Sequence, residues 1–271
     1  MELSVNGNTA YAYTGGKTFD PALPCIVFIH GAMGDHGVWT LLARWFAHHG
    51  HSVLAVDLPG HMRSAGPALP RVEEMADWVL ALMSAAGVER AALVGHSMGS
   101  LIALHAASVA AERATQLVMV GTAVPMPVPQ ALLDLSNSDV AAAIDRVVAF
   151  SFSTLAAKPS YPGPGVWLRG ASRAHMHLVL KAQEQPGNLF HHDFSACNSY
   201  AHGLHAAAAV RCPATLVLGA ADQMTQPKAA REIAARLKAT VHTLQAGHYP
   251  MLEAPDPTLA ALRSALHLIA P

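Results

Sequence analysis

A serine stands between two glycines in the run Gly95-His96-Ser97-Met98-Gly99. The spacing Gly-x-Ser-x-Gly is that of a nucleophile elbow, a sharp strand-to-helix turn that presents the serine hydroxyl at the end of the strand. The motif has the flanks that such a turn requires, because the apolar run 91–94 precedes it and a helical stretch at 97–111 begins in it. Ser97 is therefore a candidate nucleophile for acyl transfer, provided that a neighbouring base activates it.

The acid and the histidine that would activate this serine are expected after it in the chain, in that order. Of the histidines near the end of the chain, His242 lies in a predicted strand and His267 in a predicted helix, whereas His248 lies in a loop just past a strand. Asp222 is the acid that directly follows an apolar strand run. The sequence thus predicts Ser97, Asp222 and His248 as a catalytic triad.

Acyl transfer also needs two backbone amides that stabilise the oxyanion. One is expected from the residue after the nucleophile, Met98, and the other from the loop 30–34, which follows an early apolar run. Ala32 is the predicted donor in that loop, and Met33 is the alternative.

Short apolar runs that suit strands buried on both faces alternate with helical patterns along most of the chain. The runs cover residues 25–29, 53–56, 91–94, 117–120, 215–218 and, with more polar residues, 241–245. Helices are expected at 38–49, 72–86, 97–111, 227–238 and 257–269. Asn6-Gly7 predicts a hairpin between residues 3–5 and 9–13. This alternation predicts an α/β fold with a mostly parallel sheet flanked by helices.

The alternation stops between residues 124 and 209. Three prolines mark the start of this segment, and helical patterns follow at 131–152, 165–185 and 189–200. We predict that residues 124–209 form an inserted helical cap, and that residues 1–123 and 210–271 form the core.

Several motifs taken together resemble the α/β-hydrolase superfamily. They are His30-Gly31, Trp39, Asp57-Leu58-Pro59-Gly60-His61, the serine motif at 95–99, Asp222 and Gly247-His248-Tyr249-Pro250-Met251-Leu252-Glu253. The closest likeness is to the branch of esterases, perhydrolases and C–C hydrolases, and it covers nearly the whole chain except the cap. The resemblance implies an eight-stranded, mostly parallel sheet and no cofactor.

Two positions depart from the pattern of that family. It often has glycine where Met62 follows His61, so this loop is expected to pack differently here. C–C hydrolases commonly carry an aromatic residue, usually Trp, after the histidine and another shortly beyond it, whereas here Tyr249 is followed by Pro250-Met251. The second departure weighs against C–C bond hydrolysis.

The favoured interpretation is a serine hydrolase that cleaves carboxylic esters of small to medium, fairly apolar acids through an acyl-enzyme. Apolar side chains of the cap and one beside the histidine are expected to line the substrate pocket: Phe150, Phe152, Trp167, Met176 and Tyr249. Three alternatives stay open on the same fold: a C–C bond hydrolase, a perhydrolase and a non-enzymatic receptor of a small ligand.

The charge balance excludes two classes of partner, and the expected partner is a small-molecule substrate. With 17 basic and 18 acidic residues and no basic stripe, it is a poor match for nucleic acid or anionic membranes. The apolar stretch 91–111 contains the serine motif, so no membrane span is expected. Three cysteines and an N-terminus without a basic start or an apolar run favour a cytoplasmic protein. A monomer or a homodimer is expected.

Histidines gather at 48–51, 175–177 and 191–192, where Asp193 follows. A zinc site needs three or four ligands that converge in a fixed geometry, and these spacings guarantee none. We interpret the clusters as surface or cap residues, and we interpret Asp57 and His61 as structural loop residues. No metal ion and no cofactor are expected.

Overall fold

The computed structural model of the protein describes residues 1–183 and 187–266, in which eight strands form one sheet in the order β1-β2-β4-β3-β5-β6-β7-β8. The strands are β1 (Glu2–Val5), β2 (Asn8–Tyr13), β3 (Cys25–Ile29), β4 (Ser52–Val56), β5 (Ala91–His96), β6 (Ala114–Val120), β7 (Ala214–Gly219) and β8 (Thr240–Leu244). The β1–β2 and β2–β4 pairs are antiparallel, and the other pairs are parallel. The predicted α/β fold with a mostly parallel, eight-stranded sheet is confirmed.

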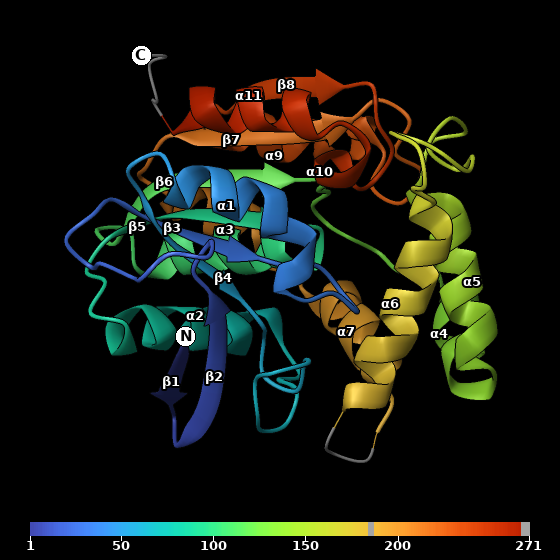
Figure 1. Cartoon of the computed structure of the whole chain (residues 1–271), viewed down its shortest axis with the longest axis horizontal. Helices are drawn as coiled ribbons and strands as arrows, with labels where there is room; N and C mark the ends of the chain where they lie inside the picture. The colour runs from blue at the N-terminus through green and yellow to red at the C-terminus, as the bar shows by residue number, and fades with distance from the viewer. Residues whose placement is uncertain (184–186, 267–271) are drawn as a thin grey trace.

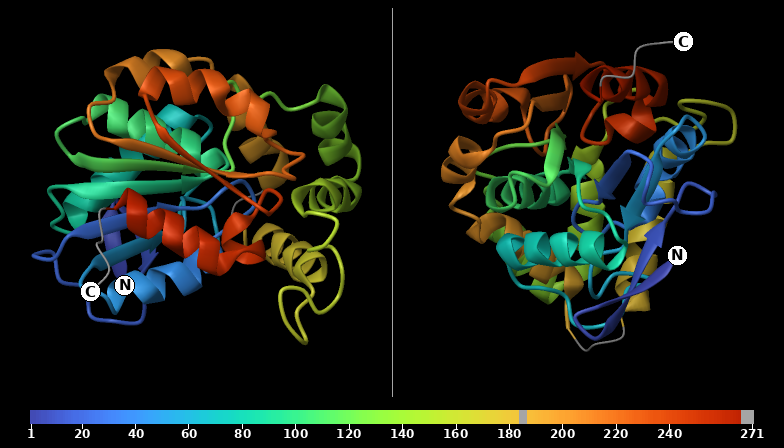
Figure 2. Two further views of the ribbon diagram at one scale, coloured as in Figure 1. Left: turned by 90° about the horizontal axis from the view of Figure 1, so that it is seen from above. Right: turned by 90° about the vertical axis from the view of Figure 1, so that its left-hand side faces the viewer.

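Helices cover both faces of this sheet (Figure 2). Alternate residues of a strand point to opposite faces, so Val27 and Ile29 of β3 pack in one apolar cluster and Ile26 and Phe28 in the other. The first cluster includes residues of α2 (Val72–Ala85), α3 (Met98–Val109) and α9 (Arg231–Leu237), and the second includes residues of α1 (Thr40–Ala47) and α11 (Pro255–Ala265). Three shorter helices complete the core: η1 (His36–Trp39), η2 (Pro227–Ala230) and α10 (Pro250–Glu253).

The predicted core helices differ from the observed ones mainly at their ends. The helix expected at 38–49 is split into η1 and α1, and the Asp35 side chain caps the start of η1 by accepting from the Gly37 amide. The helix expected at 257–269 begins two residues earlier, at Pro255, and residues 267–269 lie outside the described residues.

Between β6 and β7 the described residues form five helices: α4 (Gln130–Ser138), α5 (Val140–Ser151), α6 (Leu168–Ala182), α7 (Leu189–Ser199) and α8 (Gly203–Ala209). Helices α4 to α7 stand beside the carboxyl ends of the parallel strands (Figure 1). The helix expected at 131–152 is interrupted at Asp139, whose carboxylate caps α5 by accepting from the Ala142 amide. Residues 184 and 185, expected in a helix, lie outside the described residues.

Helix α8, the last helix of the segment 124–209 that is predicted to form the cap, packs against α3 and α9. The cap therefore meets the core both at the strand ends and along one helical layer. No helix in the described part of the chain is long and apolar enough to cross a membrane.

Candidate active site

The chain turns sharply from β5 into α3 at Ser97, which has φ 52° and ψ −119°. Two glycines make this turn possible. A Cβ atom at Gly95 would lie 2.0 Å from the carbonyl oxygen of Gly99, and a Cβ atom at Gly99 would lie 2.4 Å from that of Ile29. Real Cβ atoms do not approach so closely, so only glycine fits at these two positions. The two glycines let the helix pack tightly on the strands beside the strained Ser97.

A buried histidine–carboxylate pair joins two loops at the same edge of the sheet. The Asp222 loop follows β7 and the His248 loop follows β8, and His248 Nδ1 lies 2.9 Å from Asp222 Oδ2. Asp222 also accepts from the amides of Met224 and Thr225 and from the Thr225 hydroxyl, each at 2.8 Å. Burial alone would raise the pKa of Asp222, but His248 and the Thr225 donors bring it below its usual value. Asp222 is therefore an ionised acceptor that orients the imidazole ring.

Ser97 and His248 line one cavity of about 320 Å³ beneath the cap. Its other walls include Ala32 of the loop after β3 and Phe150 of α5. Within the described residues no hydrogen bond joins the Ser97 hydroxyl to His248, and such contacts are often long before substrate binds. The fold thus brings the three predicted triad residues to one place, from three loops at the carboxyl edge of the sheet.

Of the two predicted oxyanion donors, Ala32 lines this cavity, and Met98 directly follows Ser97, which also lines it. In the described part of the chain the Ala32 amide has no hydrogen-bond acceptor. Met98 is the first residue of α3, where an amide has no acceptor within the helix. The Met33 amide, by contrast, donates to Asp193 Oδ2 at 2.8 Å. The alternative donor is therefore already engaged.

Of the five predicted pocket residues, the structure places Phe150 in the wall of the Ser97 cavity. Phe152 is buried and stacks on Tyr249, with ring centroids 5.5 Å apart. Met176 and Tyr249 line a separate cavity of about 330 Å³. Trp167 precedes α6 with 54% of its surface exposed. These four side chains do not line the cavity that holds Ser97.

Sequence reasoning missed several neighbours of the site, Thr225 and Val147 among them. Thr225 lies 3.2 Å from His248 Nδ1 and donates to Asp222; its position three residues after an acid in a strand-end loop is a recognisable turn signal. Val147 lines the cavity beside Phe150, and their spacing of three on α5 indicates a shared helix face.

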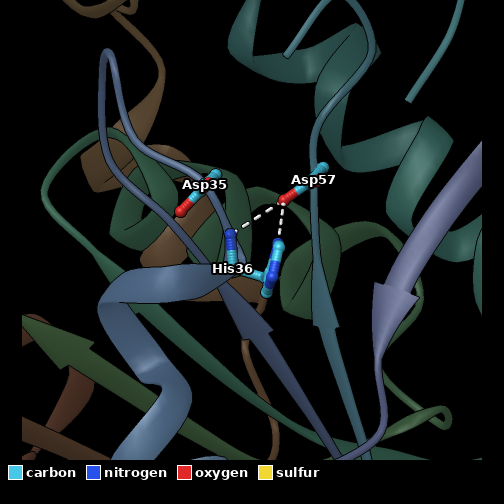
Figure 3. A group of neighbouring side chains, drawn as sticks. All are labelled: Asp35, His36 and Asp57. Atoms are coloured by element: carbon cyan, nitrogen blue, oxygen red, sulfur yellow. Dashed lines mark hydrogen bonds and ion pairs between the residues drawn. The ribbon is translucent and has the colours of Figure 1, made fainter. Parts of the chain in front are cut away.

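Asp35, His36 and Asp57 form the one group of three potential metal ligands within the described residues (Figure 3). Asp57 Oδ1 already accepts from the His36 amide at 2.8 Å and from the His36 ring at 2.7 Å, and Asp57 Oδ2 accepts from the Arg63 amide. Burial alone would lower the pKa of His36, but the hydrogen bond to Asp57 and its charge raise it. The group is explained as an ion pair that ties the loops after β3 and β4 together.

The loop after β4 also shows why glycine is common where this chain has Met62. Met62 has φ 42°, a left-handed backbone conformation that glycine adopts without strain and methionine does not. Next to it, His61 is buried and pairs with Asp193 of the cap.

Comparison with known proteins agrees with this architecture. A family model described as alpha/beta hydrolase fold matches residues 24–255. The pimeloyl-[acyl-carrier protein] methyl ester esterase of Chromobacterium violaceum is 32% identical over 257 residues, which cover 90% of this chain and 94% of that protein. The enol-lactonase of Burkholderia xenovorans LB400 superimposes with a TM-score of 0.84 at 22% identity, over 98% of this chain and 100% of that chain.

A shorter match is with the dihydrolipoyllysine-residue acetyltransferase component of the acetoin cleaving system of Pseudomonas putida. It is 37% identical over 100 residues, which span 36% of this chain and 26% of that protein. The family match over most of the sequence, the full-length relative and the eight-stranded sheet lead to one conclusion: the chain belongs to the alpha/beta hydrolase fold family.

Proposed function

We propose that the protein is a serine esterase that hydrolyses carboxylic esters of small to medium, fairly apolar acids. The observation that carries this proposal is the Asp222–His248 pair, 2.9 Å apart, at a cavity that Ser97 also lines from a strained turn. The relative of Chromobacterium violaceum, whose name describes a methyl ester esterase, supports the same bond type.

In the proposed reaction, Ser97 attacks the carbonyl carbon of the ester while His248 takes the hydroxyl proton. Asp222 holds the ring so that its Nδ1 carries a proton and its Nε2 can accept one. The amides of Ala32 and Met98 donate to the oxyanion. His248 then protonates the departing alkoxide, and water activated by the same ring releases the acid from the acyl-enzyme.

The cavity walls support an apolar acyl group. They include Leu132 and Val147 from the cap helices, with Met126 and Phe150 near them. Such walls favour hydrocarbon chains, and Arg146 and Gln223, which also line the cavity, can contact a polar group of the substrate. The cavity volume of about 320 Å³ suits a small or medium acyl chain.

Hydrolysis of p-nitrophenyl acetate, butyrate and octanoate tests this proposal. The wild type should turn over at least one of them, and Ser97→Ala should reduce kcat by a factor on the order of 10⁶ while the circular dichroism spectrum stays unchanged. Ser108→Ala, the same change on α3 away from the cavity, should retain activity.

Three outcomes would contradict the proposal, and two of them would indicate another function. A folded Ser97→Ala protein with normal turnover would exclude this serine as the nucleophile. Binding of small esters by the wild type without any turnover would indicate a receptor. Turnover of a vinylogous diketone, or of acetate with hydrogen peroxide, in preference to esters would indicate a C–C hydrolase or a perhydrolase.

A further inference from the structure

The loop that carries Ala32 is held by an atom of the cap. Met33, the next residue, has φ 55°, a left-handed conformation that residues other than glycine rarely adopt. Its amide donates to Asp193 Oδ2 at 2.8 Å, across 160 residues of sequence. This hydrogen bond therefore stabilises a backbone conformation that methionine alone does not favour.

Asp193 reaches the loop from α7, which lies on the core side of the cap against α3 (Figure 1). Its side chain is fully buried, and the same Oδ2 atom lies 3.0 Å from His61 Nε2. The other ring nitrogen of His61 lies 3.0 Å from the Pro59 carbonyl oxygen. Because both nitrogens face acceptors, both must carry protons, so His61 is an imidazolium that neutralises Asp193.

The groups around this pair leave its charges in place. The His30 ring lies 4.9 Å from that of His61, and burial, then the charge of His61, lower the pKa of His30 to about 4, so His30 is neutral. His192 Nδ1 lies 3.8 Å from Asp193 Oδ1, beyond hydrogen-bond distance. Asp57 acts on His61 in the same direction as Asp193. Burial opposes the ionised form of Asp193, but the charge of His61, together with His192, the His61 hydrogen bond and the Met33 amide, lowers the pKa of that carboxyl.

We infer that Asp193 is a positioning residue for the oxyanion hole: its carboxylate, neutralised by His61, holds the Met33 amide and so keeps the neighbouring Ala32 amide turned to the cavity. The inference rests on the proposed function, in which Ala32 is an oxyanion donor. A charged acceptor suits this task because its hydrogen bonds are stronger than those between neutral groups. The oxyanion hole is then complete only when α7 is seated on the core.

If Asp193 had a purely structural role, its loss would change stability, KM and kcat in a different pattern. If the carboxylate only anchored the cap, its loss would lower stability and alter KM through the pocket walls. An oxyanion donor acts chiefly on the transition state, so its displacement lowers kcat and weakens inhibitors that carry the oxyanion. A trifluoromethyl ketone is such an inhibitor, because its adduct with Ser97 bears a negatively charged oxygen.

The decisive experiment compares Asp193→Asn with Asp145→Asn. Asp145 makes the matched control, because it pairs with Arg173 on the exposed surface of the cap. Asp193→Asn should lower kcat for p-nitrophenyl butyrate and weaken trifluoromethyl ketone inhibition in parallel, by about 10- to 100-fold. That is less than the roughly 10²- to 10³-fold cost of losing a donor outright. KM should change less than about twofold, and Asp145→Asn should match the wild type.

The double variant Asp193→Asn/His61→Gln serves if the single variant does not fold. It replaces the buried ion pair by two amides that can still bond to each other, and the same parallel losses are expected. Normal kcat and inhibitor affinity in a folded variant would overturn the inference, as would a rise in KM alone. An active wild type that Ser97→Ala inactivates keeps the proposed function in either case, so the two ideas fail separately.

Discussion

Asp222 and Asp193 are both buried carboxylates that accept a hydrogen bond from a histidine ring, one in the core and one in the cap. Their surroundings differ. Asp222 accepts from two amides and a hydroxyl besides His248, whereas Asp193 accepts from one amide besides His61, and its Oδ1 atom has no hydrogen bond within the described residues.

The two pairs differ more clearly in what the second ring nitrogen of the histidine contacts. His248 uses Nδ1 for Asp222 and lines the Ser97 cavity, so Nε2 remains available to exchange a proton. His61 uses both nitrogens, one for Asp193 and one for the Pro59 carbonyl oxygen. The same two side-chain types therefore make a candidate base in the core and a fixed ion pair between core and cap.

The largest expected difference between the pairs is in kcat. Asp222→Asn should lower kcat by about 10⁴-fold, because an amide neither fixes the ring tautomer nor stabilises the imidazolium. Asp193→Asn should stay within the smaller loss expected from displacement of the oxyanion loop. Steady-state kinetics on p-nitrophenyl butyrate measure both. If Asp193→Asn proves the more damaging change, Asp222 is not the residue that orients the catalytic base.

The next effect concerns stability. His61→Gln should lower the free energy of unfolding by about 3–5 kcal/mol at slightly acidic pH, because it leaves Asp193 buried without its cation. Burial lowers the pKa of His61, but Asp193 raises it to a net value above that of the unfolded chain. The contribution of this charge is therefore complete below about pH 6.5 and is lost as the pH rises through the higher folded value.

Urea denaturation at about pH 6 and about pH 9 measures this dependence. The penalty of His61→Gln should be smaller at the higher pH. Asp145→Asn, which breaks an exposed ion pair, should cost less than about 1 kcal/mol. A penalty of His61→Gln that is equal at both pH values would contradict a charged His61.

The smallest expected effect is on the preference for acyl chain length, which we assign to the cap residues of the cavity wall. Phe150→Ala should shift the preference among acyl chain lengths by about 1–3 kcal/mol, because Phe150 lines the Ser97 cavity. Trp167→Ala is the matched control, an exposed aromatic residue of the cap outside that cavity. The ratios of kcat/KM for acetate, butyrate and octanoate esters report the shift. Equal shifts in both variants would show that the cavity wall is not the selector.

The amino-acid sequence was enough to predict the sheet and the turn that carries Ser97. Both depend on local rules: continuous apolar runs mark doubly buried strands, and two glycines at fixed spacing let a helix pack on a strand where no side chain fits. Asp222 and His248 could be predicted for a related reason. Loops at the carboxyl ends of parallel strands share one edge of a sheet, so their order along the chain predicts their proximity.

The contacts between the cap and the core could not be predicted from the sequence. The cap helices show which residues are apolar, but not which of them face the cavity, so Phe150 lines it whereas Phe152 and Met176 pack elsewhere. His61 and Asp193 are 132 residues apart, and no local sequence pattern around either residue predicts their contact. Their pairing depends on the angle at which α7 is seated on the core, and that angle follows from the packing of all the helices together.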